Sequence, residues 1–302
     1  MEIRKYEAFL KAVELGSFTA AADELKYTTA GIGHMVESIE TELGVSLLKR
    51  GRSGVALTRS GEELIADIRQ LVQSGRRLSE HADALRGILS GSVAIGAYYS
   101  ISSNWLPSVF QKFSDQFPQI HIRLREGGHQ LLNQWMADGQ LDLMLTSYDA
   151  RLDYEWIPLR KDRMVAVLPE NHPLASGNSV SVSDCLREKL IMPALGRDYD
   201  VYESLKSRLD AATPALTTVE SYSAMAMVEQ GLGISIMNEL ITLRQDYRVV
   251  KLPLEDADPI TLGIYVPSLS SASPAAQQMI RSLMSLQSSE FLQAPRQIPR
   301  FW

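Results

Sequence analysis

The 302-residue sequence lacks several features that would assign a protein class at once. Its one cysteine, Cys185, excludes an internal disulfide and a multi-cysteine metal site. No apolar run approaches the roughly 20 residues that a membrane-spanning helix needs, so no membrane contact is expected. Charged residues stand near the N-terminus, where an exported protein would begin its apolar stretch, and this predicts a cytoplasmic protein. No pattern points to a metal or a cofactor, and we expect neither.

An excess of positive charge is also missing. The chain has 30 Lys and Arg against 36 Asp and Glu, which gives a net charge of −6 and a sequence pI near 5.5. Because an acidic protein does not bind DNA through bulk charge, any nucleic-acid site must be local. Residues 1–91 are close to neutral, and the remainder carries most of the negative charge. The local candidate is the acid-free stretch between Glu42 and Glu62, whose cations are Lys49, Arg50, Arg52 and Arg59.

The first 60 residues predict a small helical unit followed by a hairpin. Apolar residues recur at helical spacing from Ile3 to Gly44, and Ser17 and Thr28 are typical N-cap residues. A hairpin over 45–58 follows, so the order is that of a helix-turn-helix with a wing, whose last helix would enter the major groove N-terminus first. The residues expected at the DNA are Thr19, Thr28, Thr29, Gly31, Gly33, His34, Glu37, Lys49, Arg50, Arg52 and Ser53.

Several of these DNA-binding assignments have a structural alternative. The hydroxyls of Thr28 and Thr29 can donate to phosphates, or they can simply cap the helix. Gly31 and Gly33 would let the backbone approach the DNA closely. For the basic loop the alternative is a solvated surface loop, and for Met35 we prefer core packing.

Residues 61–89 predict one long helix with an apolar seam. The seam residues are spaced alternately four and three apart, as in a coiled coil, and they include Leu64, Ile68, Leu71, Leu78, Ala82 and Leu85. Because little sequence is left around the helix to cover this seam, we expect it to pack against a second copy and form a homodimer. Packing within the chain is the alternative, and Gly75 in mid-seam weakens both arrangements.

From Gly91 onward strands and helices alternate, which is the rhythm of parallel sheets in two α/β lobes. The expected strands cover 93–97, 120–125, 141–145, 164–168, 190–192 and 234–237, and the expected helices cover 106–117, 131–137, 201–209 and 224–229. Ligands of such folds bind at the carboxyl ends of the strands. The candidates for a ligand site at these ends are Tyr99, Ser100, Ser102, Ser103, His129, Thr146, Ser147, Pro193, Arg197, Ser221 and Tyr222.

These candidates combine hydroxyls, amides, tyrosine rings and one guanidinium. Arg197 would neutralise a carboxylate, whereas Tyr99 and Tyr222 would suit an aromatic ring, so the predicted ligand is a small organic acid or an aromatic compound. For these residues the alternative is an ordinary surface loop or turn position. For His129 we favour that alternative, because its imidazole has no motif partner.

Residues 1–61 resemble the winged helix-turn-helix of LysR-type transcription regulators. The matching residues are Phe9, Val13, Gly16–Ala22, Leu25, Val36, Ile39–Glu40, Leu43–Gly44, Leu47–Arg50, Leu57–Thr58 and Gly61. The chain to about residue 287 resembles the effector domain of the same family, in segments such as Gly139–Leu143, Pro169–Leu174, Val228–Ile234 and Ser273–Ala276. Ser100, seven residues before Pro107, matches the position where the family places an effector-binding hydroxyl.

The resemblance implies a domain plan: a mostly α winged helix-turn-helix joined by a long dimerisation helix to a two-lobed α/β effector domain of the type II periplasmic-binding-protein fold. The DNA-binding domain would cover 1–60, the dimerisation helix 61–90 and the effector domain 91–302. Lobe I would comprise about 91–161 and 267–302, and lobe II about 162–266. The chain would cross between them near Leu159–Arg163 and near Gly263–Pro267.

One departure from the family lies where DNA specificity is decided. The family's recognition helix usually opens with a serine–glutamine pair and carries another serine a turn later, followed by an arginine. This chain has Thr28–Thr29, Gly33 and His34 instead, so its operator is not expected to be typical.

The leading hypothesis is a ligand-responsive regulator that binds double-stranded operator DNA as a homodimer or homotetramer. Its effector would bind between the lobes, and RNA polymerase would be a further partner. The second hypothesis is a solute-binding protein without a regulatory role, which the helix-turn-helix counts against. An enzyme is third: Cys185 with His172 or His129 could form a thiol nucleophile and base, but no local signature supports the pair.

Overall fold

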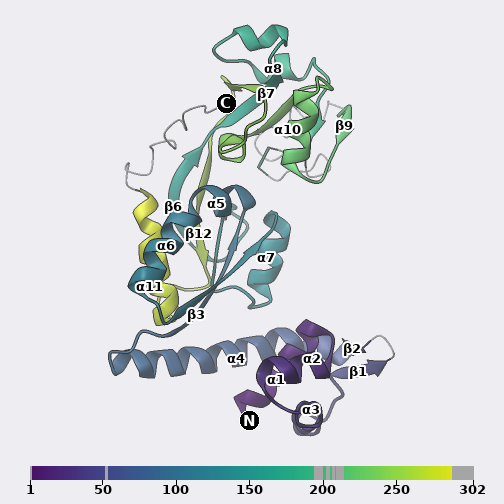
Figure 1. Cartoon of the computed structure of the whole chain (residues 1–302), viewed down its shortest axis with the longest axis vertical. Helices are drawn as coiled ribbons and strands as arrows, with labels where there is room; N and C mark the ends of the chain where they lie inside the picture. Colours follow the sequence, from purple (N-terminus) through teal and green to yellow (C-terminus); the bar gives the residue numbers. More distant parts are fainter. Residues whose placement is uncertain are drawn as a thin grey trace, which may run out of the picture.

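The structure of the chain is a computed structural model that describes residues 2–51, 54–193, 200, 201, 205, 208 and 214–287. A long helix, α4 (Arg59–Leu85), lies across one end of the molecule, with a small helical unit around its first half and two α/β lobes stacked above it (Figure 1). No helix that the described residues form is long and apolar enough to cross a bilayer.

The N-terminal unit contains the predicted helix-turn-helix and hairpin. Its elements are α1 (Ile3–Leu15), α2 (Phe18–Leu25), α3 (Thr29–Leu43), β1 (Leu48–Gly51) and β2 (Gly54–Leu57). Both predicted caps are confirmed: Ser17 Oγ accepts a hydrogen bond from the Ala20 amide at 3.3 Å, and Thr28 Oγ1 accepts one from the Gly31 amide at 3.0 Å. Between them Lys26 ends α2 in the left-handed conformation, which turns the chain sharply into α3.

The core of this unit depends on α4. Large apolar side chains of α1 and α3 are fully buried together with Ile68 and Val72 of α4, which are each 4% exposed. Gly75 brings α4 close to α1, because a Cβ at this position would lie 2.3 Å from Ile3 Cδ1. Leu64 and Leu71 pack against the same cluster. The first half of the predicted seam is therefore covered within the chain, as the alternative interpretation proposed.

The second half of the seam faces outward. Leu78 is 71% exposed and Leu85 is 90% exposed, and Ala82 between them is also exposed. We expected little sequence to cover this helix. That expectation is wrong for α4 up to Gly75, where α1 packs against the helix. It is correct for the turns after Gly75, where the seam residues are exposed.

Lobe I is a five-stranded sheet in the order β4-β3-β5-β12-β6. The strands are β3 (Gly91–Ala97), β4 (Ile120–Glu126), β5 (Leu143–Ser147), β6 (Glu155–Asp162) and β12 (Ile260–Val266). The first three are parallel, as predicted, and β12 runs antiparallel to both β5 and β6. One core packs α6 (Leu106–Gln116) and α11 (Pro274–Met284) against the sheet, and a second core includes α7 (His129–Ala137). A short helix that we did not predict, α5 (Tyr99–Asn104), follows β3.

Lobe II has a three-stranded sheet in the order β10-β7-β11 and a small pair, β8 and β9. The predicted parallel arrangement is wrong for the three-stranded sheet, in which β10 and β11 both run antiparallel to β7, and it holds for β8 and β9. The strands are β7 (Met164–Pro169), β8 (Ile191–Met192), β9 (Leu216–Thr217), β10 (Ser235–Asn238) and β11 (Val249–Pro253). The helices are η1 (Pro173–Ser176), α8 (Val182–Cys185), α10 (Ser221–Glu229) and η3 (Glu239–Thr242). The predicted helix over 201–209 lies largely outside the described residues.

The two crossings between the lobes differ in how well they were predicted. The first lies between the end of β6 at Asp162 and the start of β7 at Met164, inside the predicted range. The second comes before β12, near Ile260, rather than near Gly263–Pro267. The reason is that Leu262, Ile264 and Val266 are buried in the lobe I core, so this strand belongs to lobe I, whereas the predicted boundary placed it in lobe II.

Candidate DNA-binding and ligand-binding sites

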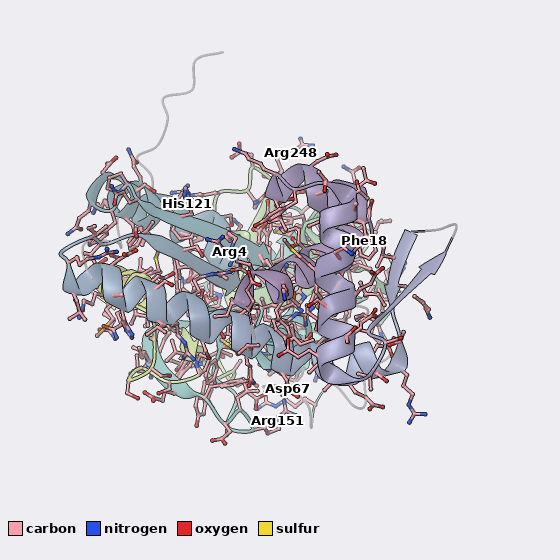
Figure 2. All side chains as sticks on the ribbon, turned by 90° about the horizontal axis from the view of Figure 1, so that it is seen from below. Arg4, Phe18, Asp67, His121, Arg151 and Arg248 are labelled. Carbon is pink, nitrogen blue, oxygen red and sulfur yellow. The ribbon has the colours of Figure 1, made fainter. Side chains whose placement is uncertain are left out.

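The start of α3 is exposed on the side of the molecule turned away from the lobes. Figure 1 shows α3 end-on beneath α4, and in Figure 2, seen from below, it lies in front. Thr28 and Thr29 are exposed there, and Thr28 already caps the helix through its side-chain oxygen. The capping interpretation of Thr28 is therefore correct, and its hydroxyl hydrogen is still available to a phosphate.

The exposed face of α3 continues through two longer side chains. His34 has 84% of its side chain exposed, and its Nδ1 lies 3.7 Å from Oε2 of Glu37, one turn later. Thr19, at the start of α2, is exposed as well. Met35 packs with the buried alanines of α1 and α2, as preferred from the sequence.

One predicted DNA contact is wrong. Gly33 is buried with Ile32 and Val36 on the inner face of α3, so its backbone cannot approach DNA. Gly31, in contrast, is partly exposed, and its amide donates to Thr28.

Hydrogen bonds join the hairpin to the helices. Glu40 Oε1 accepts hydrogen bonds from the amides of Leu47 and Leu48 at 2.6 and 3.0 Å, which ties the end of α3 to β1. The Val55 amide donates to the Gly16 carbonyl at 2.8 Å. Lys49 is exposed on β1. The side chain of Arg50 and the residues Arg52 and Ser53 lie outside the described part of the structure, so their predicted contacts stay predictions.

A buried polar cluster lies where β3 and β5 end and α7 begins. Tyr98 Oη is 3.2 Å from His129 Nδ1 and 3.0 Å from Ser147 Oγ, and Thr146 Oγ1 is 3.3 Å from His129 Nδ1. His129 is 6% exposed, and its Nε2 is 3.0 Å from Oδ2 of Asp149. Because a carboxylate only accepts, we assign the proton of a neutral His129 to Nε2, which leaves Nδ1 to accept from Tyr98.

The interpretation of His129 as a loop residue without a partner is therefore wrong. Its partner Asp149 was not predicted, although it follows Ser147 by only two residues and the rule that site residues follow strand ends would have found it. Asp149 is 5% exposed and also accepts from Nε and Nη2 of Arg151 at 2.9 and 3.0 Å. The cluster links strand ends, a helix start and a surface arginine.

The neighbouring helix α5 carries the predicted serines. Ser100 and Ser102 are 8% and 5% exposed, and Ser102 Oγ donates to the Tyr99 carbonyl and to Glu126 at the end of β4. Ser103 Oγ donates to the Tyr99 carbonyl at 2.8 Å. Ser102 and Ser103 therefore share the Tyr99 carbonyl as acceptor, and they lie on a short helix rather than in the predicted loop.

Residues of the two lobes meet at α5. The rings of Tyr99 and Tyr222 make an edge-to-face contact with centroids 5.1 Å apart, and Asn104 Nδ2 donates to the Leu240 carbonyl of η3 at 3.1 Å. Burial raises the pKa of Tyr222 to about 12, and the hydroxyl of Ser103 opposes part of this rise. Tyr99 and Tyr222, predicted on opposite lobes of one site, are in direct contact.

The other lobe II candidates are less informative. Ser221 and Tyr222 lie in the first turn of α10, which begins three residues earlier than predicted. Pro193, after β8, is buried. Arg197 lies outside the described residues, so its proposed role toward a carboxylate stays a prediction.

The crossing strand places a buried acid between the lobes. Asp162 Oδ1 accepts a hydrogen bond from the Leu240 amide at 3.1 Å. Burial raises the pKa of Asp162 to about 7, and the nearby Glu239 adds to this rise, while the Leu240 amide and the guanidinium groups of Arg160 and Arg163 lower it. The carboxyl group at the crossing therefore titrates near neutrality.

Two family models match the chain and together span most of its length. "Bacterial regulatory helix-turn-helix protein, lysR family" matches residues 3–62, and "LysR substrate binding domain" matches residues 86–287. Among curated relatives, the uncharacterized HTH-type transcriptional regulator YvbU of Bacillus subtilis is 28% identical over 293 residues, which is 96% of this chain and 100% of the relative.

Solved structures with the same fold span both parts of the chain. Full-length OxyR from Pseudomonas aeruginosa superposes with a TM-score of 0.74 at 21% identity, over 95% of this chain and 94% of that one. CbnR complexed with its target DNA gives a TM-score of 0.65 at 18% identity, over 95% of this chain and 100% of that one.

Proposed function

Since the chain belongs to the LysR family of bacterial transcription regulators, with a helix-turn-helix and an effector-binding domain, we propose how its own residues divide this work. The exposed start of α3 would enter the major groove of operator DNA. Thr28 and Thr29 would donate to phosphates there, and His34 and Glu37 would face base edges. Lys49 of the hairpin would contact the flanking backbone.

We further propose that the effector is a small organic acid or an aromatic compound bound where the lobes meet. The observation that carries this proposal is the contact of Tyr99 and Tyr222 across the lobes, beside the buried serines of α5 and the cluster of Tyr98 and His129. Tyrosine rings can stack on an aromatic ligand, and the hydroxyls can donate to its polar groups. Binding there would shift the lobes relative to each other.

The alternative functions have less support. A solute-binding protein would have no use for an exposed helix-turn-helix and wing. A thiol enzyme would need a reactive cysteine, but Cys185 is buried and its pKa is raised to about 12 by burial, with Asp184 adding to the rise. Members of this family are regulators and not enzymes.

One experiment tests both binding sites in the full-length chain. Footprinting on the DNA upstream of its own gene, with and without a panel of organic acids and aromatic metabolites, is expected to show protection of two half-sites whose pattern one compound changes. Ser100→Ala is expected to weaken the response to that compound at least about tenfold and to leave the protection itself intact. The exposed Ser176→Ala serves as the matched control. No protection under any condition would contradict the proposal.

We also propose that the exposed half of the seam joins two copies. Leu78, Ala82 and Leu85 lie on one face of α4 at spacings of four and three, and they are exposed in the described part of the chain. A homodimer, or a homotetramer of two such dimers, would bury them. Leu78→Glu together with Leu85→Glu is expected to give monomers in analytical ultracentrifugation, and dimers of unchanged stability would contradict this interface.

A further inference from the structure

A polar stripe runs along the side of α4 that faces lobe I. Its members are spaced by four, three and four residues and therefore share one helix face: Arg69, Gln73, Arg76 and Glu80. Figure 1 shows α4 passing directly beneath the start of β3. This stripe is separate from the apolar face of α4 that packs on α1 and from the exposed half of the seam. The face of α4 toward lobe I is therefore polar.

The strongest contact of this stripe is centred on Asp142, the residue before β5. Its Oδ1 accepts a hydrogen bond from Gln73 Nε2 at 2.8 Å, and its Oδ2 accepts one from the Ala94 amide of β3 at 2.7 Å. The same two strands end in the cluster that includes Tyr98 and Ser147. Asp142 therefore bonds α4 to the beginning of strands whose far ends form the candidate ligand site.

Two further contacts lie beside it. Arg69 Nη1 is 3.5 Å from Oδ2 of Asp138, and Arg76 Nη1 donates to Ser92 Oγ at 3.4 Å. Both distances are long for hydrogen bonds of a guanidinium group, and Arg69 and Asp138 are only partly shielded from water. They add little strength to the contact around Asp142.

Glu80 is the member of the stripe that opposes docking. It is 4% exposed, and its Oε1 accepts one long hydrogen bond, 3.3 Å from the Ser92 amide. Oε2 is also buried and makes no hydrogen bond of ordinary geometry to the described residues, although the Ser273 hydroxyl also interacts with this carboxyl. The carboxyl lies so close to the backbone that a Cβ at Gly91 would be 2.4 Å from Oε1. A buried carboxylate with one oxygen that lacks an ordinary hydrogen bond costs free energy that it would recover in water.

We propose that this polar contact is a releasable joint, in which Gln73 and Asp142 hold α4 against lobe I while the buried carboxylate of Glu80 weakens the hold. The DNA-binding unit is fixed to the first half of α4 by its apolar core, so undocking at this joint changes the position of that unit relative to lobe I. Glu80 and Asp142 are thus positioning residues. Only the effect on DNA rests on the proposed function, because the joint itself lies within the chain.

The ionisation of Glu80 makes the docking of α4 on lobe I depend on pH. Burial raises the pKa of Glu80, and the carboxylate of Asp142 adds to the rise, while the Ser273 hydroxyl, the Ser92 amide and the guanidinium of Arg76 lower it. A raised pKa in the docked state means that docking is most favourable below the ordinary pKa of a glutamate and weakens as the pH rises through the raised value. The joint is therefore expected to open more readily as Glu80 ionises.

Hydrogen exchange of the full-length chain, resolved to single amides and run without DNA or ligand, tests the proposal. Glu80→Gln keeps the shape and removes the charge, so exchange at the Ala94 amide, which bonds to Asp142, is expected to slow about tenfold. Asp142→Asn loses one acceptor, so exchange at the Ser92 amide, which bonds to Glu80, is expected to quicken about tenfold. Each variant is thus measured at an amide bonded to the other residue.

The exposed Glu62→Gln, on the same helix, is the matched control and should leave both amides unchanged. After correction for intrinsic exchange, the wild type should lose protection at Ala94 as the pH rises through the raised pKa of Glu80, and Glu80→Gln should not. Unchanged or faster exchange in Glu80→Gln would overturn the proposal, as would an Asp142→Asn chain with unaltered exchange at Ser92. Neither result depends on DNA binding, so this test and the footprint can fail separately.

Discussion

The two contacts that α4 makes within the chain differ in chemistry. Toward α1 the helix buries Ile68 and Val72 in a dry core, and Gly75 lets Ile3 approach closely. Toward lobe I it offers the polar stripe, in which Gln73 donates to Asp142 and the buried Glu80 has one oxygen without a hydrogen bond of ordinary geometry to the described residues. Apolar packing of this kind is lost only when the unit unfolds, whereas polar contacts can be exchanged for water at small net cost.

The difference teaches which parts of the molecule move together. The first half of α4 belongs mechanically to the DNA-binding unit, although its seam looked like a dimer interface. The effector domain is attached to that combined body through polar contacts and the short connection after Leu85. On the proposed function, a signal from the lobes would reach the DNA-binding unit through this polar contact, which we expect to be weaker than the apolar cores on either side.

The largest effect is expected on the apolar side. Ile68→Ala removes a side chain that is 4% exposed and should lower the free energy of unfolding of the DNA-binding unit by about 2–5 kcal/mol, which chemical denaturation would measure. Asp67→Ala, an exposed neighbour, should change it by less than about 0.5 kcal/mol. If Ile68→Ala lowered the free energy of unfolding by less than about 1 kcal/mol, the apolar contact with α1 would not be stronger than the polar contact with lobe I, which would contradict our account.

An intermediate effect is expected at Gly91. This residue has a φ of 129° and lies against Glu80, so Gly91→Ala should weaken docking by about 1–3 kcal/mol, measured by hydrogen exchange across α4 and β3. Gly87 also has a positive φ, 78°, but a Cβ there would have no neighbouring atom within 4 Å, so Gly87→Ala gives the cost of a positive φ without a contact. Equal effects of the two substitutions would show that the contact with Glu80 does not matter.

The contrast between the two contacts also separates what the sequence could predict from what it could not. Periodicity and caps located α1, α2, α3 and the hairpin, because these signals are local. The pattern of α4 was ambiguous, since the residues that cover Ile68 come from α1, more than 50 positions earlier. The polar stripe was overlooked because its members are charged or polar residues of an ordinary kind and only their partners near residues 91–94 and 138–142 give them a role.

The candidate ligand site could also be predicted only in part. The rule of strand ends found Ser100, Ser147 and Tyr222, which the structure brings to one region. It missed the bond of His129 to Asp149, because no sequence motif joins the two, and it placed the serines in a loop where the chain forms α5. Gly33 was misassigned because a glycine on a helix can serve the inner or the outer face.

The smallest effect is expected at the exposed edge of the joint. Arg77 Nη1 donates to the Ser271 carbonyl at 3.0 Å, but this contact is open to water. Arg77→Ala should therefore change docking by less than about 0.5 kcal/mol in the same exchange experiment. A loss as large as that of Gly91→Ala would move the centre of the joint from Glu80 and Asp142 to this edge.

The docking of α4 on lobe I is tested most directly by a disulfide across the joint. A Cβ at Gly139 would lie 3.8 Å from the Cβ of Arg69, which is about the separation found in disulfides. In a Cys185→Ser background, Arg69→Cys with Gly139→Cys is expected to form an intrachain bond on mild oxidation. The bond should also slow exchange at the Ser92 and Ala94 amides, and reduction should reverse this. A chain that forms no such bond, or crosslinks only between copies, would contradict the docking of α4 on lobe I.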